Sequence, residues 1–166
     1  MATVTVHQIV DAVETTLSAA ASFGAVVGGR SQTFDELTEG IHDTPMLQVY
    51  PDANTGTDRG QATDRTAFTD LTTGNVKHRQ KEYTILADVY ANQRTNIGED
   101  MARLVTAIDE IEDILETLDC PLFGLTVAGA VKGPIRSFRW SWQRVIFDYG
   151  GVGYVGARFT LNLVVF

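Results

Sequence analysis

A strict alternation of apolar and polar residues near the C-terminal end is the feature that most constrains the fold. From Ile135 to Phe147, and again from Tyr154 to Phe166, apolar residues occupy almost every second position. A period of two is that of a β-strand with one buried face. The segment between these runs, Asp148–Gly153, is rich in glycine and predicts a turn. The sequence therefore predicts a long antiparallel hairpin.

The N-terminal segment shows a helical period instead. Apolar residues recur at helical spacing from Val6 to Leu17, with polar residues between them. This spacing predicts an amphipathic helix of about five turns. Thr3 or Thr5 can cap its start, and Gly24 can end it.

A second amphipathic helix is predicted where one apolar stripe runs from Met101 to Leu118, over about 20 residues. Its acidic residues gather toward the C-terminal half, where the helix macrodipole disfavours negative charge. We therefore expect these acidic residues to have a function, because their position is unfavourable for the helix itself. These acidic residues are Asp109, Glu110, Glu112, Asp113 and Glu116.

Two more strands are predicted, over Met46–Tyr50 and His78–Tyr90, the second with clear alternation. Residues 25–45 are irregular, and residues 51–76 predict a long polar loop that is rich in Thr, Asp and Gly. We therefore predict one α+β domain over residues 1–166. It holds a four-stranded, mainly antiparallel sheet with two helices packed on one face, in the order α-β-β-α-β-β.

Charge is divided unevenly along the 166 residues, whose formal net charge is −8. Residues 1–131 carry 8 Lys and Arg against 20 Asp and Glu, whereas residues 132–166 carry 5 basic residues and one acid. The overall negative charge argues against unspecific nucleic-acid binding by the whole surface. An acidic body joined to a basic end is the pattern expected of a chain that associates with itself.

The sequence offers no sign of a secreted or membrane protein. Its first residues lack the basic start of a signal peptide. The longest uncharged apolar runs, Leu17–Gly29 and Pro121–Val131, are shorter than a membrane helix requires. The single cysteine, Cys120, excludes an intramolecular disulfide framework. We expect a soluble protein that is made in the cytoplasm and has no membrane partner.

Three patterns resemble ligand sites, and we interpret each as ordinary structure. Gly151–Gly156 spells G-x-G-x-x-G, but a strand follows it where a nucleotide site needs a helix. Asp52, Asn54 and Asp58 only faintly follow the spacing of a calcium loop. The histidines are scattered without metal-ligand spacing, at His7, His42 and His78. We predict no catalytic, cofactor or metal residues, and therefore no enzyme.

The aromatic and basic residues of the hairpin leave alternatives open. Trp140 and Trp142 are predicted to pack under the helices, with an exposed aromatic face for a partner as the alternative. The arginines are either solvated sheet residues or contacts to acidic neighbours or to the phosphates of passing DNA. They are Arg136, Arg139, Arg144 and Arg158.

The order of these elements resembles the tail terminator proteins of long-tailed bacteriophages, over nearly the whole chain. The resemblance rests on the N-terminal helix, the strand Met46–Tyr50, the polar loop, the strand containing KEYTI (81–85), the acidic helix and a hairpin ending in ARFTLNLVVF. It implies a hexameric ring that caps the finished tail tube, stops its polymerisation and meets the head-side connector. DNA passes through the ring without sequence readout. The implied location is the tail–neck junction of the virion, after assembly in the host cytoplasm, and no catalytic residues are implied.

A closed ring needs head-to-tail contacts in which one patch complements a different patch on the next copy. The acidic helix (Asp109, Glu110, Glu112, Asp113 and Glu116) and the basic hairpin (Arg136, Arg139, Arg144 and Arg158) are the candidate patches. Head-closure and tail tube proteins of the same assembly share parts of the pattern and are alternatives. Another is a monomeric α+β module that binds a small ligand with its Trp- and Tyr-rich sheet.

Overall fold

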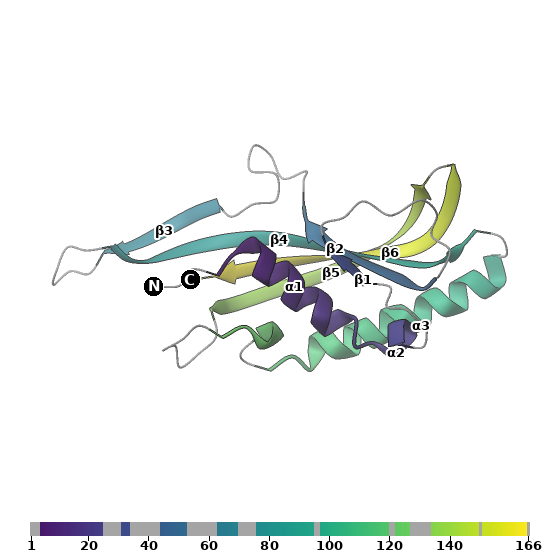
Figure 1. The fold of residues 1–166 in the computed structure, drawn as a ribbon, viewed down its shortest axis with the longest axis horizontal. Helices are drawn as coiled ribbons and strands as arrows, with labels where there is room; N and C mark the ends of the chain where they lie inside the picture. The colour runs from purple at the N-terminus through teal and green to yellow at the C-terminus, as the bar shows by residue number, and fades with distance from the viewer. Residues whose placement is uncertain are drawn as a thin grey trace.

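The computed structural model describes residues 4–24, 31–33, 44–52, 63–69, 76–94, 97–119, 122–126, 134–149 and 151–165. The helices are α1 (Val6–Leu17), α2 (Ala21–Gly24), α3 (Ile97–Glu116) and a short 3-10 turn, η2 (Leu122–Gly124). The strands are β1 (Ser31–Thr33), β2 (Met46–Pro51), β3 (Thr63–Thr69), β4 (Val76–Gln93), β5 (Ile135–Tyr149) and β6 (Val152–Val165). Figure 1 shows that these elements form one elongated sheet with the helices on one side.

The sheet has the order β1-β2-β4-β6-β5, with β3 paired to β4 beside this path. All pairs are antiparallel apart from β1 with β2. The predicted α+β class is confirmed, because the four expected strands are β2, β4, β5 and β6 and they are hydrogen-bonded neighbours. The predicted hairpin is also confirmed: β5 and β6 pair from Ile135 opposite Val165 to Tyr149 opposite Val152.

Two strands were not predicted. β1 has three residues, too few for any period to be visible, and it lies within the segment 25–45 that was expected to be irregular. β3 lies within the predicted loop 51–76, so that prediction was wrong for residues 63–69. The sequence TDRTAFT lacks regular apolar alternation, and its pairing with β4 comes from the neighbouring strand rather than from its own pattern.

The first helix is shorter than predicted. The Thr5 side chain accepts a hydrogen bond from Gln8 N, and the Gln8 side chain accepts one from Thr5 N, which forms a capping box at the expected start. The helix ends at Leu17, however, and the chain turns before α2. Ala20 in this turn and Phe23 in α2 are both buried, so the chain stays packed against the core after α1 has ended.

Both long helices cover the same face of the sheet, as predicted. Alternate residues of β4 and β6 point to this face and are fully buried, among them Ile85, Ala87, Phe159 and Leu161. The helices contribute Ile9, Val10, Val13, Leu17, Leu104, Ala107, Ile108, Ile111 and Leu115 to the same core. The second helix is confirmed as α3, whose 20 residues begin at Ile97.

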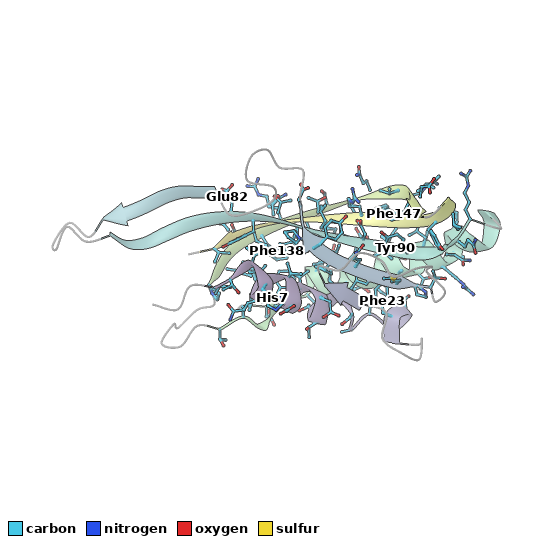
Figure 2. The ribbon with its side chains drawn as sticks, turned by 45° about the horizontal axis from the view of Figure 1, so that its top comes forward. His7, Phe23, Glu82, Tyr90, Phe138 and Phe147 are labelled. Carbon is cyan, nitrogen blue, oxygen red and sulfur yellow. The ribbon has the colours of Figure 1, made fainter. Side chains whose placement is uncertain are left out.

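A smaller cluster lies on the helix-free face, near the β5–β6 turn. It contains Met46, Tyr90, Phe147 and Tyr154. The ring centroids of Tyr90 and Phe147 are 4.4 Å apart, and Figure 2 shows both residues at the same end of the sheet. Gly156 of β6 is paired with Tyr90 of β4 and with Val145 of β5, and its lack of a side chain leaves room for the Phe147 ring.

The close approach at Gly156 gives a prediction with a control in the same strand. A Cβ at Gly156 would clash with the Val89 carbonyl oxygen and lie 2.6 Å from Phe147 Cε2. Because overpacking a filled site is unfavourable, we expect Gly156→Ala to lower the free energy of unfolding by about 2 kcal/mol. Gly153→Ala is the control, since its nearest contact would be 3.8 Å away. Urea unfolding measures both, and equal losses would contradict this account.

Candidate assembly surface

The outer edge of β5 is open along the described chain. β5 pairs with β6 from one end to the other, and no other described strand pairs with its second side. The side chains from Ser141 to Arg144 are exposed. Such an edge presents unpaired N–H and C=O groups that can pair with a strand of another chain.

Exposed apolar side chains accompany this edge. Trp142 and Ile146 on β5 are 41% and 47% exposed, and Val105 on α3 is 48% exposed. In the described part of the chain these are the large hydrophobic residues that remain exposed. Arg144 Nη1 lies 3.8 Å from Met101 Sδ, and Val105 follows Met101 by one helical turn. We call the outer edge of β5 together with Val105, Trp142 and Ile146 the edge surface.

The two tryptophans differ: one packs under the helices, and the other is exposed, as in the alternative interpretation. Trp140 is partly buried and packs against the main core, as predicted. Trp142 is exposed, and its Nε1 donates a hydrogen bond of 2.7 Å to Glu112 Oε1 on α3. Its ring centroid lies 6.4 Å from that of Phe159, so one side of the ring touches the core while the other faces outward.

The acidic residues of α3 fall into two groups. Glu112 accepts the bond from Trp142, and Glu110 Oε2 accepts a hydrogen bond of 2.8 Å from Ser22 N, so both act within the chain. Asp109, Asp113 and Glu116 are exposed. Because Asp109 and Glu116 lie three and four residues from Glu112, they flank the side of α3 that faces β5.

The arginines of the hairpin lie on two faces rather than one. Arg139 is exposed and is paired with Asn162, on the helix-free face, whereas Arg144 is paired with Ala157 and contacts α3. Arg158 is engaged inside the chain, as described next. Arg136 lies in β5, but its side chain is outside the described set. The structure therefore places the acidic helix beside part of the basic hairpin of its own chain.

Arg158 forms a partly buried ion pair, in agreement with the alternative that a hairpin arginine contacts an acidic neighbour, although its partner was not predicted. Its Nε and Nη2 donate hydrogen bonds of 2.7 and 2.8 Å to the two carboxylate oxygens of Asp88, whose side chain is 2% exposed. Tyr50 Oη donates a 2.6 Å bond to Asp88 and accepts one of 3.0 Å from Arg158. The cluster links β2, β4 and β6. The one sequence signal for it was a single charged residue, Asp88, within the otherwise uncharged and mostly apolar run Ile85–Ala91.

The environment of this cluster shifts the pKa values of its members. Burial, together with the hydrogen bond to Asp88, raises the pKa of the Tyr50 hydroxyl well above its usual range. The hydrogen bonds to Asp88 raise the pKa of the Arg158 guanidinium further, so it stays charged.

The described residues of the patterns that resembled ligand sites lie in an ordinary turn, helix and strand. Gly151, with φ of +81°, stands in the β5–β6 turn and donates from its N–H to Asp148 Oδ1, and β6 follows directly, as expected for a hairpin. On α1, His7 Nε2 lies 3.2 Å from Asp11 Oδ2, and His78 lies in β4. His42, Cys120, Asn54 and Asp58 fall outside the described residues. Within the described ranges no three His, Cys, Asp or Glu side chains gather as a metal site.

A shallow pocket of about 290 Å³ lies between α2, α3 and the start of β2. Ser22, Pro45, Ala102, Arg103 and Thr106 line it. None of these is a Trp or Tyr of the sheet, so the pocket is not the one that the ligand-binding alternative requires.

Comparison with known proteins adds no relationship: no protein-family model matches the sequence, and no curated protein matches it. Across the described residues, no helix has both the length and the apolar character needed to cross a bilayer.

The ion pair gives a prediction that separates its two members. Arg158→Leu leaves the buried Asp88 carboxylate with Tyr50 alone, so we expect it to lower the free energy of unfolding by about 3 kcal/mol. Asp88→Leu costs less because Arg158 is 29% exposed and can turn its charge to water. The double variant Asp88→Leu/Arg158→Leu, which leaves no buried charge, is expected to be more stable than Arg158→Leu. Denaturant unfolding tests this, and a double variant that is less stable than Arg158→Leu would contradict it.

The raised pKa of Tyr50 gives a pH dependence. The folded protein keeps this proton at pH values where the unfolded chain, with a tyrosine pKa of about 10, loses it. This contribution to stability is complete below about pH 10 and falls as the pH rises further. We expect the free energy of unfolding to fall more steeply from about pH 9 to about pH 11 in the natural protein than in Tyr50→Phe. Parallel slopes in urea unfolding would contradict this.

Proposed function

We propose that this chain is a structural protein of a phage tail, which assembles into a ring that caps the tail tube, ends its polymerisation and joins the tail to the head-side connector. The observation that carries the proposal is the edge surface. A long unpaired strand edge flanked by exposed apolar side chains is what natural proteins avoid unless another chain covers it. The ring number, six, comes from the family resemblance alone.

Among the strands that the structure describes, the sheet has two different open sides, which suits a head-to-tail assembly. β5 forms one side, and β1 and β3 lie toward the other. Contact between unlike edges is heterologous, and it generates a ring if the rotation between copies closes. A terminator ring would then match the tube with one face and the connector with the other, so that no further tube subunit adds.

The helix-free face of the sheet suits a channel through which DNA passes. Its exposed side chains on β5 and β6 are mostly uncharged, and they include Ser137, Ser141, Gln143 and Asn162 beside Arg139. Asp88, a buried carboxylate on this face, is neutralised by Arg158, and Glu82 lies on the same face toward the end of β4 that pairs with β3. A surface with hydroxyl and amide groups and few carboxylates neither repels nor traps a duplex, whereas the acidic outer side of α3 would repel it.

The proposal places the protein in the virion at the tail–neck junction, after assembly in the host cytoplasm. Its partners are other copies of itself, the tail tube protein and the head-side connector protein. Among the described residues, no three His, Cys, Asp or Glu side chains gather as a metal site.

Sedimentation velocity over a range of concentrations and negative-stain imaging test the proposal. We expect single open rings, and we expect growing tail tubes to stop lengthening when the protein is added. A head-closure protein would form rings that leave tube growth unchanged, and a tube protein would stack into tubes. A protein that stays monomeric at every concentration and with tail tubes present would contradict assembly altogether.

A variant of the edge surface sharpens this test. Ile146→Glu places a charge on an exposed apolar position of β5, and desolvating it in an interface is unfavourable, so ring formation is expected to weaken about tenfold or more. Thr15→Glu adds the same charge at an exposed position of α1 and serves as the control. Equal ring formation by the two variants would remove the edge surface from the interface.

A further inference from the structure

A two-stranded arm extends beyond the rest of the sheet. It consists of β3 and the start of β4, in which Thr63–Thr69 pair with Val76–Glu82. β6 pairs with β4 only from Lys81 onward, and β2 pairs with it only from Ile85 to Tyr90. Figure 1 and Figure 2 both show the arm projecting at the left, past the ends of the helices. In the described chain it is thus held by one strand pair and packs under no helix.

The arm cannot cover the edge surface of its own chain. β3 lies on the same side of β4 as β2, whereas β6 separates β4 from β5 on the other side. The outer edge of β3 therefore faces away from β5 of the same copy. A second copy placed head to tail brings these two edges together.

The lengths of the open edges favour β3 over β1 as the partner of β5. β5 has 15 residues and β3 has 7, whereas β1 has 3. Pairing through β3 would satisfy more of the unpaired backbone groups of β5 than pairing through β1.

Charge also matches the arm to the edge surface. The sequence of β3 and of Val76–Glu82 holds Lys77, Arg79 and Lys81 against Glu82, and its other two charges, Asp64 and Arg65, cancel, so the arm is net positive. Beside the edge surface, residues 109–119 hold six Asp and Glu and no Lys or Arg. Asp109 and Glu116 are exposed on the side of α3 that faces β5. Opposite charges of this kind steer two surfaces together and fix their register.

We propose that the arm of one copy docks on the edge surface of the next, with β3 adding to the open edge of β5 and the net positive charge of the arm complementing the acidic side of α3. This inference rests on the proposed ring and names the two segments that form its contact. It replaces the acidic-helix and basic-hairpin pairing expected from the sequence, because Arg158 and Arg144 already contact residues of their own chain.

Charge reversal with rescue tests the docking in the full chain. We expect Lys77→Glu/Arg79→Glu to weaken self-association about tenfold at low salt, and Asp109→Lys/Glu116→Lys to do the same. The chain that carries all four substitutions is expected to regain association within about threefold of the natural protein, because its reversed arm meets a reversed helix. Sedimentation velocity gives the dissociation constants.

The matched control is Arg103→Glu/Thr15→Glu/Ala19→Glu, which changes the net charge equally at exposed positions away from both the arm and the edge surface. We expect it to associate like the natural protein. If the arm, helix and control variants all weaken association equally, or if the four-fold variant shows no recovery, the docking is overturned.

Disulfide trapping gives a second measurement that does not depend on charge. In a Cys120→Ser background, Thr66→Cys and Ser141→Cys in one chain are expected to give a ladder of cross-linked copies on mild oxidation. Ser141→Cys alone is expected to give no dimer, and a dimer there would indicate β5-to-β5 pairing and overturn the proposal. Rings that form without any ladder would overturn the arm contact and leave the ring intact, whereas a monomeric natural protein would overturn both.

Discussion

The ion pair between Arg158 and Asp88 supports the centre of the sheet, and much of the remaining structure depends on it. Asp88 is almost fully buried on the face that no helix covers, so its charge needs a partner. Arg158 supplies that partner from β6, and Tyr50 completes the cluster from β2. Three strands that are distant in sequence are thereby fixed in one register. The same pairing removes a negative charge from the sheet face that we propose faces the channel.

With the centre fixed in this way, the sheet leaves its edges unequal. The helices cover one face, and α3 reaches β5 through Trp142 and Arg144, but among the described residues the outer edge of β5 stays open and carries exposed apolar side chains. At the opposite side, β4 continues past β2 and β6 and carries β3 outward. A single chain cannot satisfy both edges, because they point away from each other. Assembly between copies is the arrangement that would satisfy both at once.

Strong periodicity was a reliable guide to this fold. The hairpin of β5 and β6, the helix α3 and the strands β2 and β4 all lie where alternation or helical spacing predicted them. The elements that were missed, β1 and β3, are short or lack apolar alternation, and they exist because a neighbouring strand offers hydrogen bonds. The charged residues of the candidate patches were identified from the sequence. Alternation along β5 already implies that Arg139 and Arg144 lie on opposite faces, but strand register decides that Arg158 meets Asp88, and this could not be predicted.

By itself, the sequence determined the fold class, the hairpin and the helical face of the sheet, because burial of apolar residues at a period of two or of 3.6 is a local property of the chain. It also determined the uneven distribution of charge. Only the tertiary structure decided which of those charges are already paired and which remain exposed. It also decided that the arm and the edge of β5 lie on opposite sides of the sheet. These outcomes depend on contacts between residues that are far apart in sequence, and no local period encodes them.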